Sequence, residues 1–387
     1  MNSNHVEPIS DLRSLPFVTG ESNTPSNSGL PDVLPFSVGV RPDIGLIAQV
    51  PNPEVEHYLE LAYRRGSIIG TPMSAEGIGR RYADDFVDFV SRALAPRTVK
   101  GLRVLEIGCG TGYLLYRLKE LGAEVLGVEP GEQGQVGARS YGIEIIHGMF
   151  PNDQIPLKER FDVIVTYGVV EHVVDPIHFL EAQARYLTES GVVILSVPDC
   201  SECIATGDVS MFLHEHWNYF SPCSLSRLVK RVGLHLLRLE SSGYGGALYA
   251  VAGKTGESIY VESAGDEAAL FEVRMHKGIE NARQFFGAAT LAKSSLGIFC
   301  AARAINLLHL LEHKNSVRFF DDDVRLHGKY YPPFDIIIES RAALLSDPVD
   351  ELVIMSRVFG KDLSAELSLE VALSETHIAF TEEVLGN

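Results

Sequence analysis

A glycine-rich turn between a short apolar strand and a helix is the feature that most limits how this chain can fold. The stretch from Val104 to Gly112 reads Val-Leu-Glu-Ile-Gly-Cys-Gly-Thr-Gly, and a helical pattern begins at Tyr113. Glycine has no Cβ, so this spacing lets the backbone approach a ligand closely. A strand that ends in such a turn and continues into a helix is typical of α/β proteins with a parallel sheet.

Strand and helix patterns alternate along most of the chain, which predicts a mainly parallel sheet with helices on both faces. The strands expected in the first unit are residues 103–107, 124–128, 143–146, 161–167, 191–197, 235–239 and 247–251. The last two are expected to form an antiparallel hairpin at the edge. After a charged helix over 267–284, a second alternation from residue 295 onward predicts a smaller α/β unit.

The composition excludes several classes of protein. The chain has 33 Lys and Arg against 51 Asp and Glu, a formal charge of −18, which argues against non-specific binding to nucleic acid. No run of 18 apolar residues is present, so a membrane span is not expected. Residues 1–11 lack the apolar core of a signal peptide, and five cysteines do not make a disulfide scaffold. We therefore expect a cytoplasmic protein.

Two carboxylates flank the glycine-rich turn and indicate its ligand. Glu106 lies just before the first glycine, where it would repel a phosphate but suits a cation. Glu129 closes the next strand, 21 residues after Gly108, the distance at which a carboxylate can accept two ribose hydroxyls. A ribose, a positive group and no phosphate describe S-adenosylmethionine (SAM). The predicted contacts are Glu106, Gly108, Gly110, Gly112 and Glu129.

These residues resemble the class I SAM-dependent methyltransferases, which have a seven-stranded Rossmann-like domain. Residues 161–176 resemble the fourth-strand motif of that class, and residues 191–198 resemble its fifth strand. Residues 147–150 lie where the class holds the adenine ring. The resemblance implies further cofactor contacts by Pro130, Met149, Phe150, Tyr167 and His172.

A narrower resemblance concerns the methyl acceptor. Three segments are similar to the substrate side of the NDP-sugar C-methyltransferases, and two more to their C-terminal Rossmann-like domain: residues 213–221, 224–234, 245–249, 317–332 and 351–355. That family methylates the carbon beside the ketone of a 4-keto-deoxysugar nucleotide. The resemblance implies that His216 is the catalytic base, with Glu215 orienting it or contacting the sugar. The expected partner is thus a small molecule, a nucleotide sugar or a related metabolite.

The chain departs from that family at two places. No cysteine precedes Cys109, so we expect the N-terminal zinc module of the family to be absent or replaced by the proline-rich arm. The turn after the first strand of the C-terminal unit reads Cys-Ala-Ala-Arg over residues 300–303 instead of carrying glycines, so its backbone is not expected to cradle a phosphate. Two alternatives stay open for function: an O- or N-methyltransferase of another small metabolite, and a protein that binds SAM without catalysis.

Three other groups of polar side chains could in principle bind a metal ion or an anion. Cys200 and Cys203, with His214, His216 and Cys223 nearby, resemble an incomplete zinc site, and no metal is expected there. The acidic run 321–323 is expected to be a solvated loop rather than a cation site. Arg80 and Arg81 are equally consistent with a diphosphate contact and with a surface pair.

Four segments follow from these patterns. The first 53 residues hold eight of the 19 prolines and are rich in Ser, which predicts an extended or disordered arm. Residues 54–254 are expected to form the SAM-methyltransferase domain with a helical cover at its start. Residues 255–293 are expected to be a helical linker, and 294–387 a smaller Rossmann-like α/β domain.

Overall fold

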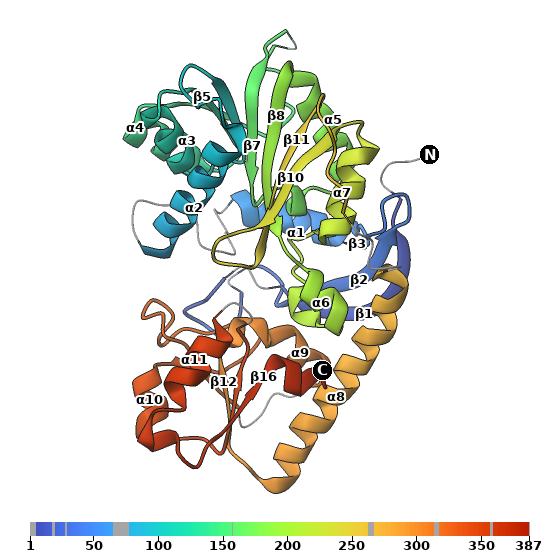
Figure 1. Ribbon diagram of the computed structural model, residues 1–387. Coiled ribbons are helices and arrows are strands. Elements are labelled where there is room, and N and C mark those ends of the chain that lie inside the picture. Colours follow the sequence, from blue (N-terminus) through green and yellow to red (C-terminus); the bar gives the residue numbers. More distant parts are fainter. Residues whose placement is uncertain are drawn as a thin grey trace.

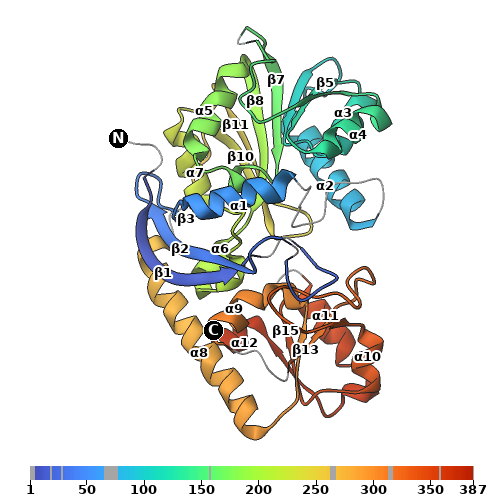
Figure 2. The ribbon, with the colours of Figure 1, turned by 180° about the vertical axis from the view of Figure 1, so that it is seen from behind.

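The computed structural model describes residues 5–17, 20–27, 29–64, 77–156, 158–261, 267–312, 317–356 and 359–386. Within these ranges the strands form a seven-stranded, a five-stranded and a four-stranded sheet. The seven-stranded and five-stranded sheets belong to two α/β units at opposite ends of the molecule, and the N-terminal strands lie beside the junction (Figures 1 and 2). Residues 65–76, within the helical cover expected at the start of the methyltransferase domain, lie outside the described residues.

The seven-stranded sheet has the order β10-β11-β8-β7-β4-β5-β6. Neighbouring strands from β8 to β6 pair in parallel, whereas β11 pairs antiparallel with both β8 and β10. This confirms the predicted fold class and the edge hairpin. The strands are β4 (Arg103–Ile107), β5 (Glu124–Glu129), β6 (Glu144–His147), β7 (Phe161–Tyr167), β8 (Leu187–Pro198), β10 (His235–Ser241) and β11 (Ala247–Gly253).

Helices cover both faces of this sheet because each has one apolar face (Figure 1). One layer holds α2, α3 and α4, and the other holds α5 and α7, with α1 crossing below the sheet (Figure 2). In α7, Ser221 and Ser224 form a reciprocal cap, and Leu225, Leu228 and Val229 are buried. The helices are α1 (Pro53–Arg64), α2 (Gly77–Leu94), α3 (Tyr113–Glu120), α4 (Glu132–Tyr141), α5 (Pro176–Tyr186) and α7 (Pro222–Arg231).

The N-terminal segment differs from the extended or disordered arm that its composition predicted. Strands β1 (Glu7–Pro16), β2 (Val33–Arg41) and β3 (Leu46–Gln49) form an antiparallel sheet with the short strand β9 (Asn218–Tyr219). Leu34, Phe36 and Val38 alternate along β2 and are buried. The proline and serine content averaged over the whole segment hid this period of two, which is the pattern of a strand with one buried face.

The second α/β unit is a five-stranded parallel sheet of order β14-β13-β12-β15-β16. Strands and helices alternate in this unit, as the pattern from residue 295 onward predicted. The elements are β12 (Leu296–Phe299), α9 (Ile305–Leu310), β13 (Val317–Phe320), β14 (Ile338–Glu339), α10 (Arg341–Ser346), β15 (Glu351–Ile354), α11 (Gly360–Leu367), β16 (His377–Phe380) and α12 (Thr381–Leu385).

The two α/β units share one apolar core with the N-terminal sheet. This core, which we call the junction core, joins Phe36 and Val38 of β2, Phe212 from the loop after β8, and Ile305 and Leu308 of α9. The long helix α8 (Glu267–Ala292) begins beside the N-terminal strands and runs down one side of the second α/β unit (Figure 1), and α6 (Ser201–Thr206) packs against it. Because the buried side chains interlock, we expect these parts to hold a fixed relative position. Among the described residues, no helix is both long and apolar enough to cross a membrane.

Gly207, which ends α6, offers a test of this packing. Its φ is +74°, and a Cβ there would lie 2.2 Å from the carbonyl carbon of Arg274 in α8. We expect Gly207→Ala to cost about 2–4 kcal/mol of unfolding free energy, because left-handed strain and overpacking add. Gly233→Ala is the control, with φ +76° and no atom within 4 Å of the added Cβ. It should cost only about 1–2 kcal/mol. Urea unfolding followed by circular dichroism measures both, and equal losses would contradict close packing at the junction.

Candidate active site

The glycine-rich turn adopts the backbone that only glycine takes readily. Gly108, Gly110 and Gly112 have φ values of +70°, +54° and +73°. A Cβ on Gly108 would collide with Val169, and one on Gly112 with Ile143, so those two glycines are needed for packing. A Cβ on Gly110 would meet no atom within 4 Å. The open side of the turn is therefore at Gly110, which is where a ligand can approach the backbone.

Glu129 ties this turn to the loop that follows β5. Its carboxylate accepts hydrogen bonds from the backbone N–H of Gly110 and of Gly131, both at 2.8 Å. Burial raises the pKa of Glu129, and these two backbone N–H groups lower it. A carboxylate has about four lone-pair positions, so both bonds leave capacity for hydroxyl donors.

Glu106, at the end of β4, is buried beneath the same turn. It is 3% exposed, and its Oε2 atom has no hydrogen-bond partner among the described residues. Burial, and then the charge of Glu129, raise the pKa of Glu106 well above its usual range. An unpaired buried carboxylate oxygen is costly, and a cationic group placed beside it would relieve that cost. The carboxyl groups of Glu106 and Glu129 therefore fit SAM, which carries an ammonium group, a sulfonium and a ribose.

Sequence reasoning missed two glycines of α4 that hold this site together. A Cβ on Gly137 would lie 1.8 Å from the carbonyl oxygen of Thr111, and one on Gly134 would lie 2.8 Å from Cγ of Glu129. The helix therefore packs directly on the glycine-rich turn and on the acidic residue. The available signal was two glycines three residues apart, which share one face of a helix.

The other predicted cofactor residues lie around this centre. Pro130 is exposed directly after Glu129, and β6 pairs with β5 so that Glu129 faces His147. Beyond β6, Met149 is 70% exposed, whereas the ring of Phe150 packs 5.6 Å from that of Tyr186. Of this adenine-side pair, Met149 is therefore the side chain left open to a ligand. Tyr167 ends β7, where its ring contacts Phe86 of α2 and burial raises its pKa to about 12.

A second cluster of titratable groups gathers next to this centre, at the carboxyl end of β7. Glu171 and His172 lie on the short 3₁₀ helix η1 (Val170–His172), and Glu215 and His216 on the loop before β9. His172 Nδ1 lies 2.9 Å from the carbonyl oxygen of Glu215, and the two histidine rings are 4.7 Å apart. Trp217 N–H donates to the carbonyl oxygen of Glu171 at 2.7 Å. These bonds bring together the residues predicted for cofactor binding and for catalysis.

Burial sets the charge state of this cluster. It raises the pKa of Glu171 and of Glu215 to about 8, lowers that of His172 to about 4, and lowers that of His216 well below its usual value. At neutral pH the carboxyls are therefore mostly protonated and the imidazoles neutral. Glu171 Oε2 and Glu215 Oε1 are buried without partners among the described residues. Both histidines are partly exposed, so a ligand can reach them.

These shifts predict how stability depends on pH. Between the unfolded pKa of about 4.5 and the folded value of about 8, the folded state holds a proton on Glu171 that the unfolded state has released. Stability is therefore full below about pH 4.5 and is lost as pH rises toward 8. We expect this loss of unfolding free energy to be roughly 1–4 kcal/mol smaller in Glu171→Gln than in wild type. Urea midpoints at pH 6 and pH 9 measure the loss in each protein, and Glu181→Gln on α5 is the control. Parallel curves for wild type and Glu171→Gln would contradict the assignment.

The predicted absence of a metal stays a prediction. Ligand atoms of Glu171, His172 and His216 lie within 4.8 Å of one another, a spacing that a metal ion accepts. The group formed by Cys200, Cys203 and the nearby histidines is less suitable as a metal site. Burial raises the pKa of the Cys200 thiol, and His214 is bonded to the carbonyl oxygen of Leu34 at 3.2 Å. In the acidic run 321–323, two carboxylates pair with arginines, which favours the solvated loop.

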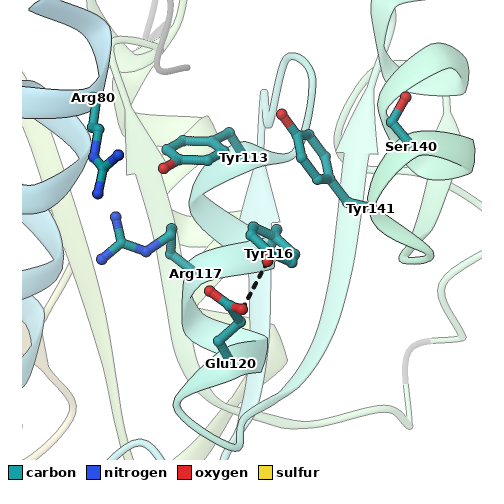
Figure 3. A pocket seen from close by; sticks show the side chains of 7 residues that line it. All are labelled: Arg80, Tyr113, Tyr116, Arg117, Glu120, Ser140 and Tyr141. Atoms are coloured by element: carbon teal, nitrogen blue, oxygen red, sulfur yellow. Dashed lines mark hydrogen bonds between the residues drawn. The ribbon is translucent and has the colours of Figure 1, made fainter. Parts of the chain in front are cut away.

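A separate pocket of about 570 Å³ lies on the outer side of α3 and is not the site described above. Figure 3 shows the guanidinium groups of Arg80 of α2 and Arg117 of α3 close to each other at one side of this pocket. Tyrosines from α3 and α4 line the rest of it. Arg80 is 3.6 Å from Asp84, which also pairs with Arg117. These contacts favour the surface-pair interpretation of Arg80.

Comparison with known proteins identifies the unit around the glycine-rich turn. Residues 78–239 match the family described as "Methyltransferase domain". The match covers less than half of the chain, and it assigns a methyltransferase domain to these residues. The matched residues contain every residue of both clusters.

Curated relatives match the same region. A ubiquinone biosynthesis O-methyltransferase of Bradyrhizobium diazoefficiens is 39% identical over 100 residues, which is 25% of this chain and 40% of the relative. The corresponding protein of Dinoroseobacter shibae is 28% identical over 172 residues, or 38% of this chain and 69% of the relative. In the first three relatives the match spans less than two thirds of the relative's own length.

Solved structures are similar at lower identity. Magnesium protoporphyrin IX methyltransferase of Synechocystis, solved with bound SAH, is 18% identical and covers 48% of this chain and 90% of its own, with a TM-score of 0.37. A SAM-dependent methyltransferase of Clostridium acetobutylicum is 13% identical and covers 46% and 92%, with a TM-score of 0.36.

Proposed function

We propose that the protein transfers the methyl group of SAM to a carbon atom beside the ketone of a small molecule, such as a nucleotide-linked keto-sugar. The observation that carries this proposal is the second cluster, in which neutral histidines and protonated carboxyls share one end of the sheet. The curated relatives are methyltransferases by name, which supports methyl transfer as the reaction. The acceptor rests on the sequence resemblance and on the chemistry of this cluster.

Carbon next to a ketone is a poor acid, so its methylation needs a base and a group that stabilises the enolate oxygen. His216 serves as the base, because burial keeps its imidazole neutral and able to accept a proton. Glu215, whose carboxyl is mostly protonated at neutral pH, can donate a hydrogen bond to the carbonyl oxygen of the acceptor. His172 holds the Glu215 backbone in place through its 2.9 Å contact. Bound SAM supplies an electrophilic methyl group on its sulfonium.

O-methylation is the second candidate, and the printed names of the curated relatives favour it. The same neutral histidine can take a proton from a hydroxyl, but hydroxyl acceptors need no protonated carboxyl to stabilise an enolate. A protein that binds SAM without catalysis is disfavoured, because the glycine-rich turn and both of its carboxylates are complete.

One experiment separates these candidates. The protein is incubated in deuterated water with a 4-keto-deoxysugar nucleotide, with and without SAM, and followed by NMR and mass spectrometry. Carbon methylation predicts exchange of the proton beside the ketone without SAM, and a carbon-bound methyl group with it. Methyl transfer to a phenolic acceptor without any such exchange would favour the O-methyltransferase. No methyl transfer over a broad acceptor panel, despite SAM binding, would support the non-catalytic alternative.

A further inference from the structure

The N-terminal sheet ends against the loop before β9, which carries the proposed base. Strand β3 pairs with β9 through Ala48 and Asn218, and the backbone N–H of Gln49 donates to the carbonyl oxygen of Trp217 at 3.0 Å. The indole of Trp217 is 4% exposed and packs in a small core with side chains of the N-terminal segment and of α1. The N-terminal sheet therefore holds this loop both by backbone pairing and by burial of a large side chain.

Asn218 also bonds to the short helix η1, which carries Glu171 and His172. Its side-chain amide donates to the carbonyl oxygen of Val170 at 3.2 Å and to that of Val173 at 2.7 Å. These two carbonyls lie directly before and directly after the Glu171–His172 pair. Asn218 is 1% exposed, so water does not compete for its bonds. One buried amide therefore fixes the backbone on both sides of the pair.

Arg41, the last residue of β2, fixes the orientation of this amide. Its Nε atom donates to Oδ1 of Asn218 at 3.3 Å, and its Nη2 atom donates to the carbonyl oxygen of Val174. A guanidinium can only donate, so the amide must turn its oxygen to Arg41 and its NH₂ group to η1. Arg41 is 1% exposed, and its rigid fork of donors joins β2 to the backbone after η1 as well as to Asn218.

The same bonds set the position of η1 relative to the loop before β9. His172 Nδ1 donates to the carbonyl oxygen of Glu215 at 2.9 Å, because a carbonyl can only accept, and the ring of His172 lies 4.7 Å from that of His216. The backbone N–H of Trp217 donates to the carbonyl oxygen of Glu171 at 2.7 Å. A shift of η1 would therefore displace His172 and, with it, the backbone on which His216 is held.

We propose that Arg41 is a positioning residue for proton abstraction: acting through Asn218, it holds η1 and the loop before β9 so that His216 faces the acceptor carbon. This inference rests on the proposed function, because it takes His216 as the base. It gives the N-terminal sheet a part in the reaction through its contacts with the loop and with η1. Precise support matters here, since a displacement of about 1 Å in a reacting group can lower the rate about 100-fold.

Asn218→Leu in the full-length protein tests this role, because leucine has a similar size but can neither donate to η1 nor accept from Arg41. We expect the single-turnover rate with a 4-keto-deoxysugar nucleotide to fall about 10- to 100-fold, while the calorimetric affinity for SAM stays within about twofold of wild type. Acrylamide quenching of Trp217, the single tryptophan of the chain, should increase as the loop loosens. Arg41→Lys keeps the charge but not the fork of donors, so it should lower the rate less, and it carries the test if Asn218→Leu does not fold.

The matched control is Asn281→Leu, which removes a side-chain amide that joins α8 to the carbonyl oxygen of Leu385 in α12 at 2.7 Å. It should change neither the rate nor the quenching of Trp217. A folded Asn218→Leu protein with the wild-type rate or the wild-type quenching, or an equal effect in Asn281→Leu, would overturn the positioning role. The quenching measurement needs no acceptor, so it still decides whether these bonds hold the loop if wild type methylates no ketone, a result that would refute only the proposed function.

Discussion

Replacement of His216 by asparagine should lower kcat about 10²- to 10⁴-fold while leaving the affinity for SAM unchanged. Asparagine keeps the size and polarity of the side chain but cannot accept a proton at neutral pH. His216 lies outside the glycine-rich turn, so the residues predicted to bind SAM there should keep their positions. Single-turnover kinetics with a 4-keto-deoxysugar nucleotide measures the rate, and calorimetry measures SAM affinity.

His178→Asn is the matched control, because His178 is exposed on α5 and belongs to neither cluster. It should leave kcat within about twofold of wild type. Added imidazole should restore part of the activity of the His216 variant, which a merely structural defect would not allow. A His216→Asn enzyme with near wild-type kcat would remove the assignment of the base and most of the case for carbon as the acceptor.

Replacement of Gly110 by valine should abolish measurable SAM binding, with a loss of affinity above about 100-fold. The side of Gly110 that faces no protein atom is the side from which a ligand approaches, so branched carbons there occupy the ligand's space. Glu129→Ala should be milder, about 10- to 100-fold, as expected from charge-assisted hydrogen bonds of roughly 1.5–3 kcal/mol. Part of that loss comes from the turn, which Glu129 also holds through Gly110 N–H.

Gly142→Val is the control for backbone strain. Gly142 ends α4 with a φ of +60°, and a Cβ there would also meet nothing within 4 Å. Both variants therefore carry similar left-handed strain, but only Gly110 lies on the open side of the turn. Calorimetric SAM affinity close to wild type in Gly110→Val would refute the cofactor site, and an equal loss in Gly142→Val would assign the effect to strain.

The sequence by itself determined the glycine-rich turn and its flanking carboxylates, which we predict to bind the cofactor. Glu106, Gly108, Gly110 and Gly112 are local to one strand–turn–helix, and Glu129 closes the neighbouring strand, so spacing alone places them together. The backbone confirms what the residue types require, since each of the three glycines has a positive φ. Alternation of strands and helices similarly predicted both α/β units, because periodicity is a short-range property of the chain.

Only the tertiary structure decided what surrounds the acceptor. His172 and Glu215 are 43 residues apart and meet because β7 and the loop before β9 end at one edge of the sheet. Strand β3 pairs with β9, so the N-terminal segment is part of a sheet, whereas its composition predicted an extended or disordered arm. Asn306 of α9 bonds to the carbonyl oxygens of Val209 and Phe212 beside the junction core, which buries side chains from all three sheets or their connecting loops. Such contacts depend on burial between distant segments, and no local pattern encodes which distant surfaces will cover one another.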